Sequence, residues 1–213
     1  MLISDKYNFI FIHVPKNAGT SIHKALAMHS NLACRYQNAP GMYYLKKLTG
    51  NNATLSIFDT HIEVARARKI IGKRWDKYVS FAVVRNPYDR AVSRFHYFKG
   101  RPDLYEHDRY EATDSFRQHI MEMSDQTWND RQSFYLESEG QIGVTDLLRF
   151  EQLESDWKKL MEKIGLKNIT LAFKNRSERD TDFMKYYDSE TIRKVNEIYK
   201  REFELFDYQM ITP

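Results

Sequence analysis

Cysteine is almost absent from this chain of 213 residues, which holds only Cys34. One thiol cannot form an internal disulfide or a zinc site of several cysteines, so a cysteine-stapled secreted scaffold is excluded. Long apolar runs are also missing, since no stretch approaches the roughly 20 residues that cross a bilayer. Charges at Asp5 and Lys6 come too early for a secretory signal. We therefore expect a soluble, cytoplasmic protein with no membrane span.

Neither sign of charge is in strong excess. The chain has 33 lysines and arginines against 29 aspartates and glutamates, a net charge of +4. This mild excess suits a bound anion but is not the basic stripe of a nucleic-acid-binding protein, so no nucleic-acid partner is expected. The apolar content of 42% excludes a disordered chain. The length predicts a single domain over residues 1–213.

Strand-like and helix-like segments alternate along the sequence. A nearly continuous run of β-branched and aromatic residues predicts a buried strand over residues 7–14, and residues 78–84 are predicted as a second buried strand. Residues 144–150 and 169–173 are predicted as a third and a fourth strand. Apolar residues at helical spacing predict helices over residues 21–28, 87–98, 153–164 and from Ser189 onward. This alternation predicts an α/β fold with a central, mainly parallel sheet flanked by helices. His13, within the first strand, is expected to be a buried or hydrogen-bonded strand residue.

Residues 30–54 and 100–130 show neither the pattern of a strand nor the helical spacing of apolar residues. They are polar and loop-like, so we expect them to be insertions that wall the functional site rather than build the sheet. The tyrosines expected to shape its pocket are Tyr36, Tyr43, Tyr44, Tyr105 and Tyr110.

The segment from Lys16 to Ser21 leaves a strand and enters a helix. Backbone N–H groups and the positive end of the helix then meet at one place, which predicts an anion site. Ala18 and Gly19 keep the backbone accessible, Thr20 and Ser21 add hydroxyl donors, and Lys16 adds a mobile cation. The alternative is an ordinary turn with a surface lysine, capped by Thr20 or Ser21.

This segment is not the usual nucleoside-triphosphate loop. That loop needs Gly-Lys followed by Ser or Thr, with the hydroxyl on magnesium, and neither tripeptide occurs in the chain. The pattern therefore argues against a kinase.

A second candidate anion site begins at Arg85, directly after the second strand. Asn86 is a good N-cap and Pro87 a good first helical residue, so a helix carries Ser93. Arg85 and Ser93 together can bind one phosphate, because the guanidinium presents a planar fork of donors. The alternative is an arginine in a structural salt bridge and a serine bonded to its own helix. Two such sites suit a nucleotide with phosphates at both ends of its ribose.

The two motifs together resemble the carbohydrate-type (family 2) sulfotransferases. These are Pro15-Lys16-Asn17-Ala18-Gly19-Thr20-Ser21 and Val84-Arg85-Asn86-Pro87-Tyr88-Asp89-Arg90-Ala91-Val92-Ser93. Further stretches that look familiar are Asp130-Arg131-Gln132-Ser133-Phe134-Tyr135-Leu136, Arg149-Phe150-Glu151-Gln152-Leu153 and the closing residues 199–208. The resemblance implies a P-loop-like three-layer fold and the donor 3′-phosphoadenosine-5′-phosphosulfate (PAPS), which leaves as adenosine 3′,5′-bisphosphate. Missing anchor, stem and paired cysteines favour a soluble, bacterial-like member.

The resemblance also implies roles for individual residues. Lys16 would contact the sulfuryl group and the bridging oxygen, and the loop from Asn17 and Ala18 through Gly19, Thr20 and Ser21 would hold the 5′-phosphate. Arg85 and Ser93 would bind the 3′-phosphate. A basic loop with Asn175 and Arg176 would cover the adenosine, or is simply solvated. The acceptor would be a hydroxyl of a carbohydrate or small molecule, and no metal is expected.

The acceptor hydroxyl needs a base. Thr60 and Glu63 predict a capping box for a helix that ends before Gly72, which puts His61 at the first helical position. A helix amino terminus disfavours imidazolium, so His61 would stay neutral and basic. Asp59 is the second candidate.

Two other functions stay open. A P-loop-type kinase or nucleotide hydrolase predicts magnesium-dependent ATP turnover. A non-catalytic module predicts tight binding of adenosine 3′,5′-bisphosphate without transfer to any acceptor. The sequence does not determine the oligomeric state.

Overall fold

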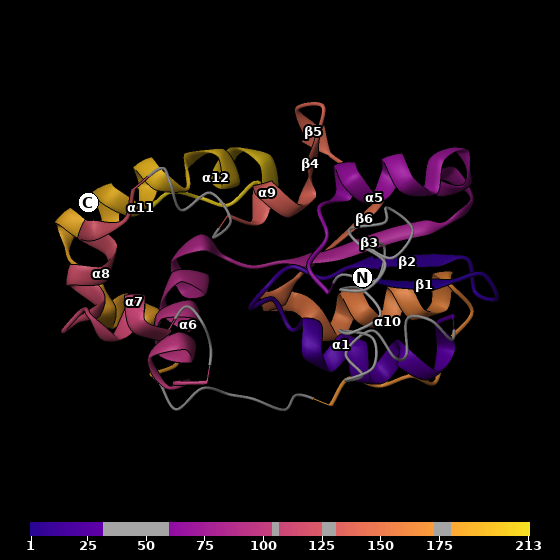
Figure 1. Cartoon of the computed structure of the whole chain (residues 1–213), viewed down its shortest axis with the longest axis horizontal. Helices are drawn as coiled ribbons and strands as arrows, with labels where there is room; N and C mark the ends of the chain where they lie inside the picture. Colours follow the sequence, from indigo (N-terminus) through magenta and orange to yellow (C-terminus); the bar gives the residue numbers. More distant parts are fainter. Residues whose placement is uncertain (32–59, 104–106, 125–130, 173–179) are drawn as a thin grey trace, which may run out of the picture. The chain divides into compact units, whose positions relative to one another are not determined.

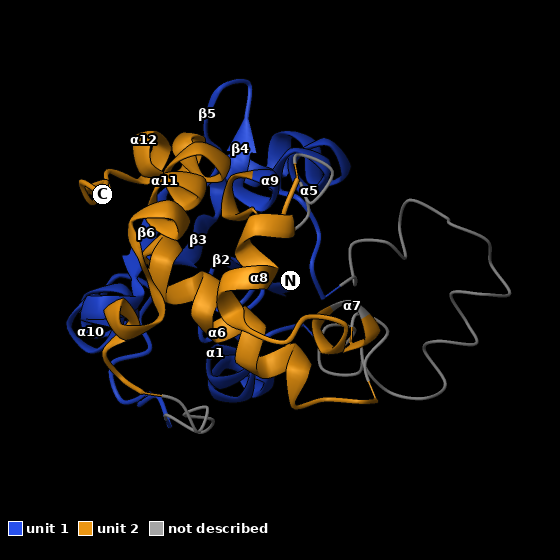
Figure 2. Ribbon diagram, turned by 90° about the vertical axis from the view of Figure 1, so that its left-hand side faces the viewer, with its two compact units in different colours: residues 1–84, 134–173 blue, residues 85–133, 174–213 orange. Residues whose placement is uncertain are grey.

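The computed structural model describes residues 1–31, 60–103, 107–124, 131–172 and 180–213. These residues form two compact units, coloured separately in Figure 2. Unit 1 takes its residues from 1–84 and 134–173, and unit 2 from 85–133 and 174–213. The boundary therefore falls directly after Val84, and Arg85 is the first residue of unit 2.

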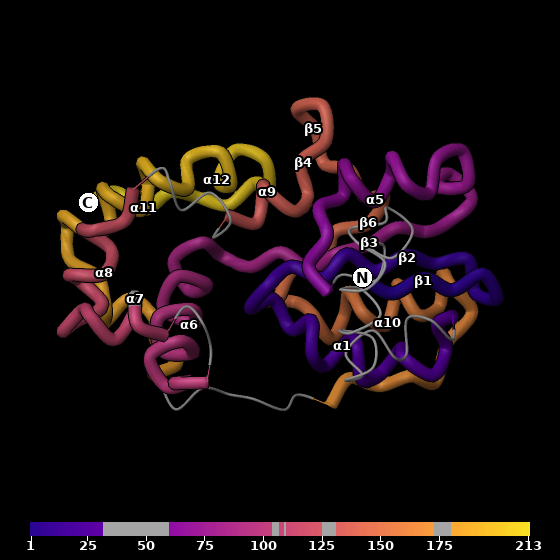
Figure 3. Tube along the Cα trace, viewed as in Figure 1, coloured from indigo at the N-terminus to yellow at the C-terminus, as the bar shows by residue number. Residues whose placement is uncertain are grey.

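Unit 1 is built on a four-stranded sheet in the order β1-β2-β3-β6. Its strands are β1 (Leu2–Ser4), β2 (Phe9–Ile12), β3 (Val79–Val84) and β6 (Asp146–Arg149). Strands β2, β3 and β6 are parallel, and β1 pairs antiparallel with β2 at the edge. Figure 3 traces the chain through these strands. The prediction of a central, mainly parallel sheet is confirmed.

Helices cover both faces of this sheet. Helices α1 (Gly19–Leu26) and α10 (Leu153–Lys163) lie on one face, and α5 (Val64–Ile71) lies on the other (Figure 1). All four residues of β2 are buried, as expected for a strand covered on both sides. The shorter elements of unit 1 are η1 (Ala27–His29), η2 (Gly72–Lys77), β4 (Glu137–Ser138), β5 (Gln141–Ile142) and η4 (Phe150–Gln152).

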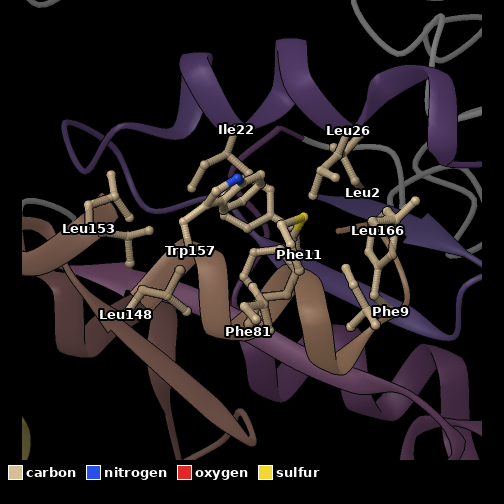
Figure 4. Packing of buried hydrophobic residues seen from close by; sticks show 14 residues of the cluster. Leu2, Phe9, Phe11, Ile22, Leu26, Phe81, Leu148, Leu153, Trp157 and Leu166 are labelled. Atoms are coloured by element: carbon tan, nitrogen blue, oxygen red, sulfur yellow. The ribbon is translucent and has the colours of Figure 1, made fainter. Parts of the chain in front are cut away.

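The main core of unit 1 fills the space between the sheet and helices α1 and α10. Figure 4 shows Phe9, Phe11 and Phe81 among the buried side chains of this cluster. Other members, from the helices and β6, are Ile22, Leu26, Leu148, Leu153, Trp157 and Leu160. The helical apolar stripes read from the sequence thus pack on the sheet as predicted.

Unit 2 is helical over its described residues. Its elements are α6 (Pro87–Lys99), α7 (His107–Glu111), α8 (Phe116–Glu122), η5 (Phe183–Tyr186), α11 (Ser189–Ile198) and α12 (Lys200–Phe206). Helix α9 (Gln132–Leu136) crosses the boundary between the units. The core of unit 2 includes Tyr88, Val92, Phe95, Tyr110, Ile120, Val195 and Phe203. The predicted N-cap is confirmed, because the Asn86 side chain accepts a hydrogen bond from the Tyr88 N–H at 3.0 Å.

The fourth predicted strand is wrong for residues 169–172, which form no strand, and Phe173 lies outside the described residues. The Ile169 carbonyl accepts a hydrogen bond from the Trp157 indole at 2.8 Å. The Ile169 N–H donates to the Leu166 carbonyl at 3.2 Å. The backbone of Ile169 is thus satisfied locally and needs no neighbouring strand. The fourth strand of the sheet is instead β1, which is too short to show a period.

The capping box expected at Thr60 does not form. Helix α5 starts at Val64 with Glu63 as its N-cap, and no side chain caps it. The Thr60 carbonyl instead accepts a hydrogen bond from the Met1 nitrogen at 2.9 Å, and His61 bonds to the His13 carbonyl. These bonds hold residues 60 and 61 in a turn before the helix. The predicted end of the helix at Gly72 is confirmed, since Gly72 is its C-cap with φ of 61°.

The loop expected over residues 100–130 is also wrong where the structure describes it, because helices α7 and α8 lie there. Tyr110, expected in a pocket, is fully buried in the core of unit 2 and stacks on Phe98 and His119. The single helix expected from Ser189 is interrupted at Tyr199, which separates α11 from α12. Residues 32–54 lie outside the described residues.

Removing the N-cap of α11 tests the assembly of unit 2. The Asp188 carboxylate accepts a hydrogen bond from the Thr191 N–H at 2.8 Å. The backbone N–H of Asp188 donates to the Thr191 hydroxyl at 2.9 Å. The bond from the Thr191 backbone is the main reason that the pKa of Asp188 falls to about 2. We expect Asp188→Ala to lower the free energy of unfolding in urea by about 1 kcal/mol at neutral pH.

Glu190→Ala is the matched control for this prediction. Glu190 and Asp188 both pair with Arg117, but Glu190 does not cap the helix. The control should lose less stability than Asp188→Ala, since exposed ion pairs contribute about 0–1 kcal/mol. Equal losses would show that the ion pairs, not the cap, stabilise this end of α11.

Candidate functional site

The loop between β2 and α1 has an unusual backbone. Lys16 and Ala18 both adopt positive φ, 68° and 59°, the left-handed region that costs a non-glycine residue about 1–2 kcal/mol. Ala18 is the N-cap of α1, and no side chain caps the helix. The cap by Thr20 or Ser21, which belonged to the alternative interpretation of this turn, does not form. The Ser21 and Ile22 N–H groups donate to the Ala18 carbonyl at 3.0 and 3.2 Å. The N–H groups of Gly19 and Thr20, at the carboxyl end of a strand, are the donors of this turn that can face an anion.

Asn17 fixes this loop to the sheet. Its side-chain amide donates a hydrogen bond to the Val83 carbonyl, near the end of β3, at 2.8 Å. Asn17 is 1% exposed, so water does not compete with this bond. The loop after β2 is thus tied to the neighbouring parallel strand, and the carboxyl ends of β2 and β3 lie at the same edge of the sheet.

Gly19 is the first residue of α1 because no larger residue fits there. A Cβ at this position would lie 1.7 Å from Nε2 of the His13 imidazole. His13 is buried, as the sequence predicts, and stacks on Phe11 at 5.7 Å between ring centroids. Burial lowers the pKa of His13 well below its usual range, and the charge of His61 lowers it further. The ring packed against the loop is therefore neutral.

The His61 ring is oriented by the backbone of His13. Its Nδ1 lies 3.0 Å from the His13 carbonyl oxygen, which can only accept, so Nδ1 carries the proton. The neutral ring then has its lone pair on Nε2. The two imidazoles are 4.5 Å apart, and Tyr135 lies edge-on to His61 at 6.3 Å. His61 is exposed. The carbonyl thus fixes the tautomer of a neutral ring, and His61 does not occupy the first helical position that the sequence predicts.

In unit 2, Arg85 is buried and its guanidinium is fixed by Asp89. Nε and Nη2 both lie 2.7 Å from Asp89 Oδ2. Arg85 is 6% exposed, so this ion pair is well shielded from solvent. Ser93 is buried on the same side of α6, one turn beyond Asp89. The salt bridge that the sequence left as an alternative is therefore present.

The backbone of Arg85 is held by a side chain from α9. Gln132 Oε1 accepts the Arg85 N–H at 2.8 Å, and Gln132 Nε2 donates to the Arg85 carbonyl at 2.8 Å. The carboxylate of Glu202, from α12, accepts hydrogen bonds from the Gln132 N–H and from Gln132 Nε2. Gln132 and Glu202 are both fully buried.

The candidate residues fall into three groups. In unit 1, the structure brings His61 to the His13 carbonyl, beside the start of α1, where the residues from Lys16 to Ser21 lie. Arg85 and Ser93 belong to unit 2. Asp59, Asn175 and Arg176 lie outside the described residues.

Sequence reasoning missed four residues around these candidates: His13 as a packing partner of Gly19, and Asp89, Gln132 and Glu202 around Arg85. Asp89 could have been found, because it stands four residues after Arg85, the spacing of a helical ion pair. Gln132 lies in a motif that the sequence singled out without a role. Nothing in the sequence links Glu202 to it, since 70 residues separate them.

Within the described ranges, no helix is long and apolar enough to span a membrane. No cluster of three or more histidine, cysteine, aspartate or glutamate side chains that could bind a metal is found among the same residues. The expectation that no metal is needed stays a prediction.

Gly19→Ala tests the contact between the loop and His13. The added methyl group would overlap the imidazole, and overpacking of this kind typically costs 1–3 kcal/mol. We expect the variant to unfold at a lower urea concentration than the wild type.

His13→Ala removes the obstructing ring and serves as the second arm of a double-mutant cycle. In that background Gly19→Ala should cost much less, with a coupling of about 1 kcal/mol or more. Additive losses would mean that the ring does not restrict residue 19.

The Sulfotransferase family model matches residues 1–209 of the chain. No curated protein and no solved structure gives a significant match.

Proposed function

The chain belongs to the sulfotransferase family, and we propose that it transfers a sulfuryl group from PAPS to a hydroxyl of a carbohydrate or small-molecule acceptor. Membership supports sulfotransferase activity in general. The observation that carries the choice of donor is the uncapped amino terminus of α1, with Lys16 and Ala18 in left-handed conformations, at the carboxyl end of β2. Left-handed residues among right-handed ones turn successive N–H groups toward one anion.

We further propose that the whole of residues 1–213 works as one P-loop-like domain. A sheet with helices on both faces supports this, and so does a ligand loop at the carboxyl end of a parallel strand. Residues 30–54 and 100–130 are proposed to contribute the acceptor site.

In the proposed complex, the loop from Lys16 to Ser21 binds the 5′-phosphosulfate. Two features favour this assignment: the backbone donors at the start of α1, and the bond from Asn17 that fixes the loop on β3. Gly19, with no Cβ, also lets a ligand approach the backbone closely. Arg85 and Ser93 bind the 3′-phosphate, and Asn175 and Arg176 cover the adenosine.

The bound donor supplies the sulfuryl group, which passes in line to the acceptor oxygen as its bond to the 5′-phosphate breaks. Positioning and charge stabilisation are then the main work of the protein, as in phosphoryl transfer. Lys16 and the N–H groups of α1 stabilise the negative charge that develops on the departing phosphate. These donors are preorganised, because the buried bond from Asn17 fixes the loop on β3.

His61 is proposed to take the proton of the acceptor hydroxyl. Its Nδ1 proton is engaged by the His13 carbonyl, so Nε2 is the basic atom, and the exposed ring is accessible to an acceptor. This arrangement resembles the common one in which a carbonyl or carboxylate fixes the tautomer of a catalytic histidine. Asp59 remains the alternative base.

Two other functions give different results in the same tests. A P-loop-type kinase or hydrolase would turn over ATP with magnesium. A non-catalytic module would bind adenosine 3′,5′-bisphosphate but transfer nothing. The position of Lys16, before the turn rather than inside it, argues against the kinase.

Isothermal calorimetry tests the nucleotide. We expect the protein to bind adenosine 3′,5′-bisphosphate more tightly than ATP with magnesium. Arg85→Ala should weaken the binding of the bisphosphate about tenfold or more, because a charge-assisted bond to phosphate is lost. Arg74→Ala, which removes an exposed arginine paired with Asp5, is the control and should leave the affinity unchanged. Tighter binding of ATP with magnesium would contradict the proposal.

Turnover of radiolabelled PAPS with a panel of hydroxyl acceptors tests the chemistry. We expect His61→Ala to lower kcat about 10²-fold or more, with the affinity for the nucleotide nearly intact. Lys16→Ala should likewise reduce turnover more than binding. His29→Ala, at another histidine of unit 1, is the control. Unchanged kcat in His61→Ala would remove His61 as the base, and absence of transfer by the wild type would favour the non-catalytic module.

A further inference from the structure

The buried side chain of Gln132 joins two parts of unit 2 that are distant in sequence. Its amide accepts the Arg85 N–H and donates to the Arg85 carbonyl, both at 2.8 Å. The same amide nitrogen donates to Glu202 Oε2 at 2.9 Å. Gln132 is 0% exposed, so none of these three bonds is shared with solvent. A side chain held in this way has one orientation.

A primary amide is the side chain that this position requires. Arg85 directly follows β3, where the ladder of the strand has ended, yet the residue is buried and both of its backbone groups need partners. Glutamine offers an acceptor and a donor on one planar group, as a peptide bond of a neighbouring strand does. Glutamate has no donor, and asparagine is shorter by one methylene. Beyond the end of β3, the Gln132 amide therefore makes the two backbone hydrogen bonds that a neighbouring strand would make to Arg85.

Glu202 in turn holds Gln132 in place. Its carboxylate accepts from the Gln132 and Ser133 N–H groups, the first two of α9, besides the Gln132 amide. Glu202 is fully buried, and burial raises its pKa against the opposing effects of Arg90 and of these hydrogen bonds. A buried carboxylate is tolerated only where such partners surround it, so its geometry is restricted.

We propose that Gln132 is a positioning residue for recognition of the 3′-phosphate, and that Glu202 acts through it. Gln132 fixes the backbone of Arg85, and Asp89 fixes the guanidinium at 2.7 Å, so the arginine is held at both ends before a ligand arrives. A preorganised donor binds more tightly because no side-chain freedom is lost on binding. This inference rests on the proposed function, in which Arg85 binds the 3′-phosphate.

The test compares two nucleotides that differ only in the 3′-phosphate. Dissociation constants are measured by calorimetry for adenosine 3′,5′-bisphosphate and adenosine 5′-monophosphate, and their ratio reports recognition of the 3′-phosphate. Gln132→Met keeps the length of the side chain but removes all three bonds. We expect the ratio to fall about tenfold, with little change in the affinity for the monophosphate.

Two further variants separate positioning from general stability. Glu202→Gln places an amide against the Gln132 amide and should lower the ratio in the same direction, which keeps the test open if Gln132→Met does not fold. Asn196→Ala removes bonds to the Tyr88 hydroxyl and to the Ile211 carbonyl in the same unit, and neither bond involves Arg85, Gln132 or Glu202. It should reduce stability and leave the ratio unchanged.

Each outcome is decisive. An unchanged ratio in Gln132→Met and Glu202→Gln overturns this inference and leaves the donor assignment standing. An equal fall in Asn196→Ala also overturns it, because general destabilisation would then explain the loss. If the wild type does not prefer the bisphosphate, the assignment of Arg85 fails and the role of Gln132 fails with it.

Discussion

The parallel pairing of β2 with β3 is the constraint on which the candidate site of unit 1 depends. It places the carboxyl ends of both strands at one edge, and the buried bond from Asn17 to Val83 holds the loop after β2 against that edge. Without this bond the left-handed residues Lys16 and Ala18 would relax, since each conformation is unfavourable by itself. The sheet therefore stabilises the conformation of the loop.

In unit 2, buried charged and polar groups of α6 help to hold the helices together. Helix α6 buries Arg90 and Ser93 together with apolar residues, so much of its surface packs inside the protein. Tyr88 contributes to both kinds of contact: its ring packs on Phe203, and its hydroxyl accepts a hydrogen bond from the Ile211 N–H at 2.9 Å. A motif that reads in the sequence as a phosphate site is thus also a main support of the helical unit.

The sequence was sufficient to predict features that depend on neighbouring residues. Strands β2 and β3 show their burial as apolar runs, and the cap at Asn86 and the break at Gly72 follow from residue type. Features that depend on distant residues could not be predicted. The His13 carbonyl determines the tautomer of His61, and the Trp157 indole satisfies Ile169 in place of a strand. The burial of Tyr110, within a polar stretch, depends on helices far along the chain.

The two candidate anion sites also differ in whether their residues are close together or far apart in the sequence. The loop after β2 is recognisable because all of its residues are consecutive. Arg85 is recognisable as well. Gln132, which bonds to its backbone, comes 47 residues later, and no local pattern marks Gln132 or the Glu202 that bonds to it.

The buried imidazole of His13 couples the fold to acidity. Its pKa in the folded chain lies well below the ordinary value of 6.5. Below pH 6.5 the ring is therefore protonated in the unfolded chain while it stays neutral in the folded one. Above pH 6.5 neither state is protonated at this ring, and it leaves stability unaffected. As the pH falls below that value, protonation stabilises the unfolded state. The free energy of unfolding then falls by up to about 1.4 kcal/mol for each pH unit, until the ring in the folded chain is also protonated. Acidification would thus loosen the very turn that the imidazole packs against.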